Sequence, residues 1–148
     1  MGGGGAKKKK GSGNETVSKL TELGLTVFDP NDKTVDLDWD CLAGYEGQKR
    51  LIEDTVLLAL SYPEIYDDIT INTRVKYEAN RPKAVLFEGP PGTGKTTSAK
   101  IIAQQVNIPL IYMPTEAIMS KFYGESESKL AQMWELCEQL GRVIIFID

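Results

Sequence analysis

The feature that most constrains this chain is the run GPPGTGKT at residues 89–96. It fits the spacing G-x-x-x-x-G-K-[ST] and falls between an apolar stretch at residues 84–88 and an amphipathic stretch at residues 95–106. A loop of this kind turns the chain from a strand into a helix while its backbone N–H groups line a concave anion site. The run therefore predicts an α/β protein in which a strand, this loop and a helix follow one another.

Each residue type in the loop has a physical role in holding phosphate. Gly92 and Gly94 let the backbone approach an anion that side chains would obstruct, and the N-terminus of the next helix adds partial positive charge. Lys95 reaches the β- and γ-phosphates, and the Thr96 hydroxyl coordinates Mg²⁺. The alternative, a plain turn between strand and helix, needs neither the lysine nor three glycines. We therefore predict a site for ATP and Mg²⁺ made by Gly89, Pro90, Pro91, Gly92, Thr93, Gly94, Lys95, Thr96 and Thr97.

Composition excludes several other kinds of chemistry. The 148 residues include no histidine, which rules out Ser-His and Cys-His nucleophile pairs and most transition-metal sites. The two cysteines are too few for a disulfide framework or a zinc site, and Cys137 is expected to be a core residue. The net charge of −4 gives no reason to expect nucleic-acid binding. No apolar run is long enough to span a membrane and no secretory signal is recognisable, so we expect an intracellular protein, in the cytoplasm or an organelle.

The periodicity of apolar residues places the other elements. Amphipathic helices are predicted at residues 46–60, 95–106 and 126–140. Short strands are predicted at residues 25–28, 84–88, 109–113 and 143–147. The residues between the first of these helices and residue 81 form a polar stretch in which no helix or strand is predicted. Strand and helix alternate from residue 84 onward, which favours a parallel sheet between helices, a three-layer αβα arrangement.

The N-terminal part of the chain has a different composition. Residues 1–13 hold six glycines and four consecutive lysines, and we predict a disordered tail. A myristoylation signal at Gly2 is the weaker alternative, because Ala6 stands where Ser or Thr is wanted. Residues 14–35 are predicted to be a short separate segment that begins with a helix capped by Asn14.

Asp148 follows the nearly all-apolar strand predicted at residues 143–147 (VIIFI). A carboxylate at the carboxyl end of a parallel strand lies beside the glycine-rich loop by the general rule for open α/β sheets. There it would hold Mg²⁺ through the metal's water shell. The alternative is an Asp that simply ends a buried strand. The loop favours the first interpretation, so Asp148 is predicted to be a metal ligand with Thr96 and a catalytic residue with Lys95.

Beyond the loop, residues 36–148 resemble the AAA family of P-loop ATPases. GPPGTGKT is the AAA form of the phosphate loop, and VIIFI with Asp148 looks like a Walker B strand. Residues 37–44 (LDWDCLAG) are similar to the W-x-x-[IL]-[AG]-G segment that lies against the adenine, which implies nucleotide contacts for Ala43 and Gly44. Residues 120–127 (SKFYGESE) resemble pore loop 1 of the AAA proteins that remodel other polypeptides. That implies a grip on substrate by Phe122 and Tyr123, although an aromatic pair before a turn is otherwise more often core.

The resemblance implies a subunit of a ring, usually a homohexamer, that couples ATP hydrolysis to pulling on a polypeptide. We place the chain on a plant or algal branch of that family. The family's catalytic Glu, polar sensor, arginine finger and helical lid are missing from the sequence. In the family strand order 5-1-4-3-2, the first three strands alone leave a gap beside the phosphate loop, so we expect a fragment truncated at the Walker B strand with an incomplete sheet.

Two alternatives to a protein-remodelling AAA ATPase stay open at this point. One is a truncated, non-catalytic nucleotide-binding fragment, and the other is another P-loop NTPase, such as a small-molecule kinase. No general base is evident in the sequence, so hydrolysis by this chain itself is left open.

Overall fold

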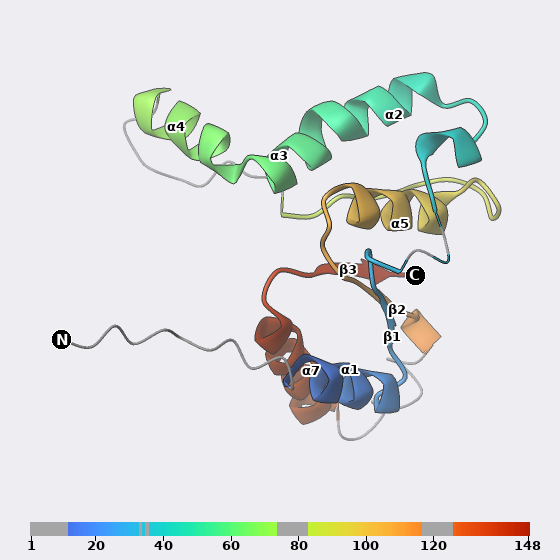
Figure 1. The fold of residues 1–148 in the computed structure, drawn as a ribbon, viewed down its shortest axis with the longest axis vertical. Helices are drawn as coiled ribbons and strands as arrows, with labels where there is room; N and C mark the ends of the chain where they lie inside the picture. The colour runs from blue at the N-terminus through green and yellow to red at the C-terminus, as the bar shows by residue number, and fades with distance from the viewer. Residues whose placement is uncertain (1–11, 33, 35, 74–82, 117–125) are drawn as a thin grey trace. The chain divides into compact units, whose positions relative to one another are not determined.

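The computed structural model describes residues 12–32, 34, 36–73, 83–116 and 126–148 (Figure 1). Contacts within the chain divide it into two compact units. The first unit joins residues 1–28 to residues 109–148, and the second unit is residues 29–108. Of the N-terminal segment at residues 14–35, residues 14–28 thus lie in the first unit and residues 29–35 in the second.

The first unit is built on a three-stranded sheet in the order β1-β2-β3. β2 (Leu110–Met113) and β3 (Ile144–Ile147) are parallel, and α7 (Ser126–Leu140) lies between them in the chain as the crossover helix that parallel neighbours need. β1 (Thr26–Phe28) pairs antiparallel with the other edge of β2. The parallel arrangement predicted for the core strands is therefore confirmed for β2 and β3, and β1 makes the sheet mixed.

The core of the first unit lies where α1 (Ser12–Glu22) and α7 pack together, and α1 also contacts β1 (Figure 1). The buried cluster consists of Leu20, Leu25, Ile111, Met113, Met133, Leu136 and Cys137. Cys137 is the core residue that was predicted, and burial raises the pKa of its thiol. Met133 and Leu136 of α7 are buried with Cys137, whereas Leu130 and Trp134 are exposed. Helix α1 starts at Ser12, so Asn14 lies inside the helix and is not its cap.

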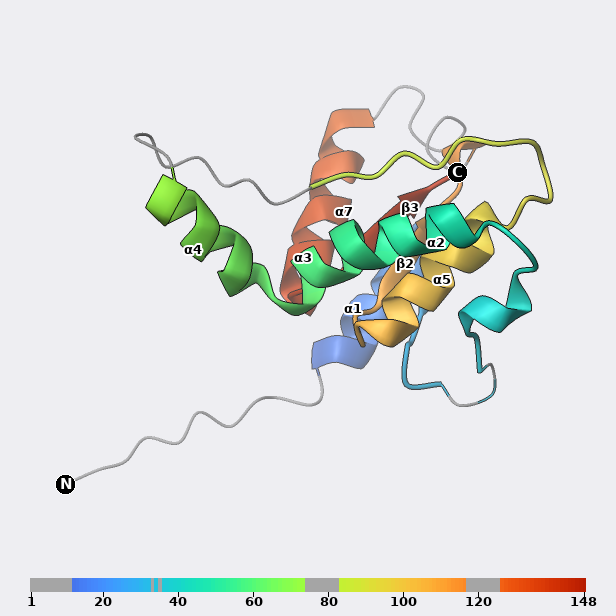
Figure 2. The same ribbon diagram turned by 90° about the horizontal axis from the view of Figure 1, so that it is seen from above.

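The second unit begins with a short 3-10 helix, η1 (Trp39–Cys41), and continues into a long helical run. That run consists of α2 (Glu46–Ile52), the π-helical segment η2 (Glu53–Leu57) and α3 (Leu58–Ser61), which confirms the helix predicted at residues 46–60. Figure 2 shows α2 and α3 following one another along one rod, with α4 turning away from it.

Helix α4 (Pro63–Thr73) was not predicted, because its sequence was interpreted as a polar stretch. Its first residue is a proline, which is well suited to the first position of a helix because that N–H has no helical partner to lose. This position was the signal available in the sequence.

The strand predicted at residues 84–88 is absent, and this part of the chain is extended coil that leads into the glycine-rich loop. Leu86 is 88% exposed and Val85 47% exposed. A strand exists only when another strand pairs with it, and no strand in the described part of the chain pairs with residues 84–88. Of the three core strands predicted, the second and third are present as β2 and β3. The α/β class is confirmed, and the sheet is incomplete and mixed.

Candidate functional site

The glycine-rich loop leads directly into α5 (Lys95–Gln105), as predicted. Gly92 and Gly94 have φ values of +79° and +88°, in the left-handed region that glycine adopts without steric penalty. Gly94 is the N-cap of α5 and makes no side-chain cap hydrogen bond. The first backbone N–H groups of α5 therefore face the loop, where helix termini of this kind bind anions.

Lys95 reaches back across the loop instead of pointing away from it. Its Nζ donates to the carbonyl oxygens of Gly89 and Pro90, at 2.7 and 2.9 Å. The Thr93 hydroxyl also donates to the Pro90 carbonyl, at 2.8 Å. The ammonium is thus held against the loop by two carbonyl acceptors, and a phosphate oxygen can accept from the same N–H donors.

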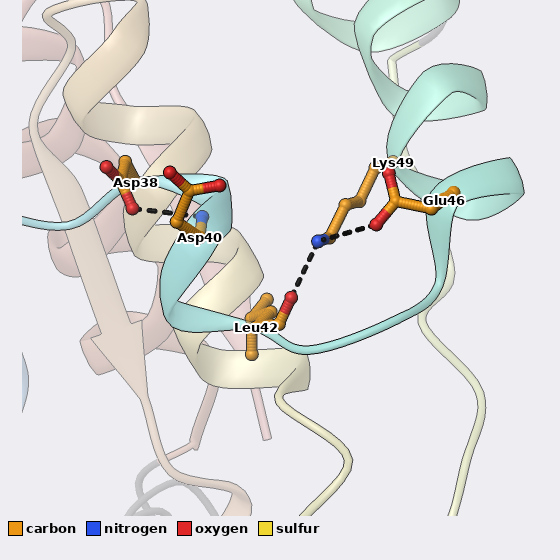
Figure 3. Close-up of polar contacts among 5 residues, drawn as sticks. All are labelled: Asp38, Asp40, Leu42, Glu46 and Lys49. Carbon is orange, nitrogen blue, oxygen red and sulfur yellow. Dashed lines mark hydrogen bonds and ion pairs between the residues drawn. The ribbon is translucent and has the colours of Figure 1, made fainter.

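The segment after η1 lies close against this loop. A Cβ built on Gly94 would come within 2.5 Å of Leu42 Cδ2, so the Leu42 side chain would have to shift for any larger residue. The segment is braced locally, because the Asp38 carboxylate accepts from the Asp40 N–H at 2.9 Å (Figure 3). The Leu42 N–H also donates to the Trp39 carbonyl at 3.1 Å. The sequence resemblance predicted that residues 37–44 lie near the adenine. In the structure, Leu42 of this segment lies against the phosphate loop.

A cavity of about 230 Å³ lies between this segment and the loop. Its wall combines apolar and polar side chains: Trp39, Leu42, Tyr45, Gln48, Lys49, Ile52, Phe87, Glu88, Gly89, Pro90, Thr93, Lys95 and Ser98. Trp39 Nε1 is buried in this wall and has no hydrogen-bond partner among the described residues. A buried N–H donor of this kind is costly unless a ligand or water accepts from it.

The two residues predicted for the base, Ala43 and Gly44, are exposed and flank the cavity wall without forming it. Their neighbours Leu42 and Tyr45 line it instead. Tyr45, Gln48 and Lys49 were not predicted as site residues, because their places in the wall depend on how α2 begins. Tyr45 has a φ of +61°, unusual for a residue with a side chain, and is the N-cap of α2.

Asp148 lies at the carboxyl end of β3, as predicted, and its backbone is tied to the residues after β2. Its N–H donates to the Met113 carbonyl at 3.1 Å, and its own carbonyl accepts from both the N–H and the hydroxyl of Thr115. The Tyr112 hydroxyl donates to the Asp148 carboxylate at 3.2 Å. Burial, and then this hydrogen bond, raise the pKa of Tyr112, whose ring stacks on Phe146. Asp148 belongs to the first unit and the glycine-rich loop to the second.

The predicted metal ligands offer suitable chemistry for Mg²⁺. Thr96 is the second residue of α5 and carries a hydroxyl, and Asp148 carries an exposed carboxylate. Both are the hard oxygen donors that this ion prefers. Within the described residues no group of three or more His, Cys, Asp or Glu side chains gathers as a metal cluster. Magnesium at phosphate sites needs only one or two protein ligands besides phosphate and water, so the two predicted residues fit it.

The other predicted residues are placed as follows. Pro91 and Thr97 lie in the loop and in the first turn of α5, beside the residues that line the cavity. Phe122 and Tyr123, predicted to grip substrate, lie outside the described residues.

A glycine-rich turn with two left-handed glycines, a lysine folded over it and a helix that starts there define a P-loop nucleotide-binding protein. Residues 85–148 match the model of the family described as "ATPase family associated with various cellular activities (AAA)". The chain belongs to this AAA family, and its fold is that of part of an AAA domain.

Individual relatives agree with the family match. The chain is 37% identical over 113 residues to the cell division cycle protein 48 homolog of Archaeoglobus fulgidus, covering 76% of this chain and 14% of that protein. It is 34% identical over 136 residues to the human ATPase family gene 2 protein homolog A, covering 89% of this chain and 14% of the relative. It is 32% identical over 133 residues to the proteasome-activating nucleotidase of Methanocella arvoryzae, covering 90% of this chain and 29% of the relative. The chain therefore spans less than a third of each of these relatives.

A solved structure resembles the chain over nearly its whole length. The FIGL-1 AAA domain in complex with ADP superposes with a TM-score of 0.66 at 25% identity, covering 97% of this chain and 43% of that chain. Among the described residues, no helix is both long enough and apolar enough to cross a membrane. The placement on a plant or algal branch stays a prediction.

Proposed function

We propose that this chain binds ATP as its Mg²⁺ complex, with the phosphates in the loop and the base in the adjoining cavity. The observation that carries the proposal is the position of Lys95, whose ammonium lies on the concave side of a loop with two left-handed glycines at the start of α5. A phosphate group there would replace the loop carbonyls as acceptor and meet the N–H groups of the helix terminus.

In this proposal, the side chain of Lys95 and the backbone of the loop bind different phosphate oxygens. Lys95 neutralises the charge of the β- and γ-phosphates, and backbone N–H groups of the loop meet the remaining phosphate oxygens. The nine predicted residues of the loop and first turn contact the phosphates, and Ala43 and Gly44 flank the base. Apolar wall residues such as Leu42 and Tyr45 give the base a surface on which to lie, which supports binding of a nucleotide in preference to phosphate alone.

The metal in this proposal is Mg²⁺, held by the Thr96 hydroxyl and by Asp148. The ion would neutralise charge that builds up on the phosphates during transfer. Thr96 is held in place by its position in the first turn of α5, and the Asp148 backbone is held by Met113 and Thr115.

At the level of a full-length protein, we propose an ATPase that assembles as a homo-oligomeric ring, a hexamer, and remodels polypeptides. The support is family membership and the relatives, whose names include a proteasome-activating nucleotidase. Phe122 and Tyr123 would touch the substrate. If a Phe122→Ala change in a chain of the relatives' length left ATP-driven remodelling intact, the pore-loop assignment would be wrong.

The binding proposal is tested with the 148-residue chain by titrating ATP with and without Mg²⁺ in a calorimeter. Lys95→Ala is expected to weaken ATP binding at least tenfold, because the charge-assisted contacts of its ammonium are lost. Lys83→Ala, which removes an exposed lysine outside the loop, is the matched control and is expected to bind as the unchanged chain does. ATP binding that survives Lys95→Ala unchanged would overturn the proposal. Turnover measured in the same samples shows whether a carboxylate of this chain acts as the base.

A further inference from the structure

Lys49 of α2 is more buried than is usual for a lysine. Its side chain is only 12% exposed, and its Nζ donates to the Leu42 carbonyl at 2.6 Å (Figure 3). The ammonium also lies 3.3 Å from the Glu46 carboxylate, but that side chain is 75% exposed, so the ion pair is solvated and weak. The short bond to the Leu42 carbonyl is therefore the contact that holds the lysine inside the structure.

Leu42 is the residue through which Lys49 meets the nucleotide site. Its backbone carbonyl accepts from Lys49, and its side chain lies against Gly94 at the end of the phosphate loop. Lys49, Leu42 and Tyr45 also share the wall of the 230 Å³ cavity. The start of α2 is thus connected to the phosphate loop through Leu42, which is contacted on both sides.

The segment between Leu42 and α2 has little other support. Ala43, Gly44 and Tyr45 are exposed, and Gly44 and Tyr45 both have left-handed backbones. This left-handed conformation is sterically unfavourable for Tyr45 but not for glycine. A segment of this kind keeps one shape only if contacts at its ends determine it, and the Lys49 bond to Leu42 is such a contact.

We propose that Lys49 is a positioning residue of the nucleotide site: through the Leu42 carbonyl it holds residues 42–45 in place as the wall for the base. The inference rests on the proposed function and assigns to Lys49 a role toward the base and ribose, not toward the phosphates. Its ammonium is occupied by Leu42 and Glu46, whereas Lys95 lies on the phosphate loop.

A purely structural role makes a different prediction. If Lys49 only fastened α2 to the preceding loop, its loss would weaken every ligand of the site equally, or none. A role in positioning the base affects a ligand with a base and spares one without it. Inorganic tripolyphosphate carries the charge and oxygen atoms of the ATP phosphates but no base, so it separates the two cases.

The experiment compares ATP with tripolyphosphate, each with Mg²⁺, by calorimetry on the 148-residue chain. Lys49→Met keeps most of the stem and removes the donor, and we expect the Kd for ATP to rise about tenfold while that for tripolyphosphate stays within about twofold. Arg50→Met removes one positive charge from the adjacent, exposed position of α2, and neither Kd should change. Glu46→Gln tests the solvated ion pair and should also leave both constants unchanged.

Two further variants keep the outcome decisive. If Lys49→Met does not fold, as judged by circular dichroism, Lys49→Arg replaces it. A guanidinium cannot reproduce the same point contact, so ATP alone should again bind more weakly. Lys95→Ala should weaken both ligands, and failure of that result counts against the proposed function. Equal weakening of ATP and tripolyphosphate by Lys49→Met, or no weakening of either, overturns the role of Lys49 while leaving the ATP site intact.

Discussion

At the scale of single residues, the site depends on contacts that leave little room for substitution. Gly94 combines a left-handed backbone with a neighbour, Leu42, that would lie 2.5 Å from any added Cβ. Gly92 has a similar backbone but nothing within 4 Å of the same position. Substitution of Gly92 therefore reports the cost of the backbone conformation alone, whereas substitution of Gly94 adds the cost of the contact with Leu42.

Gly92→Ala is expected to lower the free energy of unfolding by about 1–2 kcal/mol, the cost of a left-handed alanine. Gly94→Ala should cost about 1 kcal/mol or more beyond that, because Leu42 must move. Urea unfolding of both variants measures the difference. Adding Leu42→Ala to Gly94→Ala should recover part of the extra loss as a coupling energy. Equal losses in the two single variants would show that the contact with Leu42 has no energetic weight.

The Tyr112 hydroxyl and the Asp148 carboxylate give a second residue-scale prediction. The pKa of Tyr112 is raised first by burial and then by the bond to Asp148, so its titration should lie above the ordinary value of about 10. The folded protein favours the protonated phenol, so this contribution to stability is present below pH 10 and is lost as the pH rises through the folded-state pKa. NMR of labelled tyrosine, assigned with Tyr112→Phe, measures the shift.

Asp148→Ala tests the cause of that shift. It removes the acceptor and its charge, so the pKa of Tyr112 should fall but stay above its ordinary value, because burial remains. A pKa that does not change in this variant would contradict the assigned role of Asp148.

At the scale of elements, α5 shows how a helix that carries a site is ended. Asn107 follows the helix with a φ of +53°; its N–H donates to the Gln104 carbonyl at 3.2 Å, and the Ile108 N–H donates to the Ala103 carbonyl at 3.0 Å. This pair of bonds is the Schellman motif, and the buried Ile108 completes it. Because α5 starts at the phosphate loop, its end helps to hold the helix that presents Lys95.

Asn107→Gly should be neutral or slightly stabilising, because glycine tolerates the left-handed conformation best. Asn107→Val should lower the free energy of unfolding by about 1–2 kcal/mol, since a β-branched residue is strained there. Gln105→Val, at the exposed last residue of α5, is the matched control and should cost about 0.5 kcal/mol or less. Thermal unfolding of the three variants decides between them, and a Val at 107 no worse than a Val at 105 would refute the capping argument.

At the scale of the whole molecule, the first unit joins parts of the chain that are far apart in sequence. Its core brings Leu20 of α1 together with Met133 and Cys137 of α7. Bringing such distant segments together costs loop-closure entropy, which the burial of these side chains must offset. The N-terminal helix is therefore part of the folded unit and not an appendage to it.

Leu20→Ala is expected to lower the free energy of unfolding by about 2–5 kcal/mol, because Leu20 is fully buried and its loss leaves a cavity. Leu51→Ala on α2, where the side chain is 63% exposed, should change it by less than about 0.5 kcal/mol. Urea unfolding followed by circular dichroism compares the two. A small effect of Leu20→Ala would mean that α1 is not integral to the core.

Several features of this protein were determined by its sequence alone. The phosphate loop, the α5 helix after it, the helix at residues 46–60 and the parallel strands β2 and β3 were all predicted within a few residues. These features depend on local properties: glycines at fixed spacing, apolar residues at helical spacing, and short apolar runs between turn residues. These local properties do not depend on contacts with distant parts of the chain.

Other features were decided only in the tertiary structure, because they depend on a partner distant in sequence. Residues 84–88 have the composition of a strand but lack a paired neighbour among the described residues, and β1 pairs antiparallel with the free edge of β2. The buried face of α7 is set by α1 and the sheet. The cavity wall formed by Leu42, Tyr45 and Lys49 exists because one carbonyl meets a lysine and one side chain meets a glycine. A sequence pattern specifies which residues can make such contacts, and packing between segments decides which of them do.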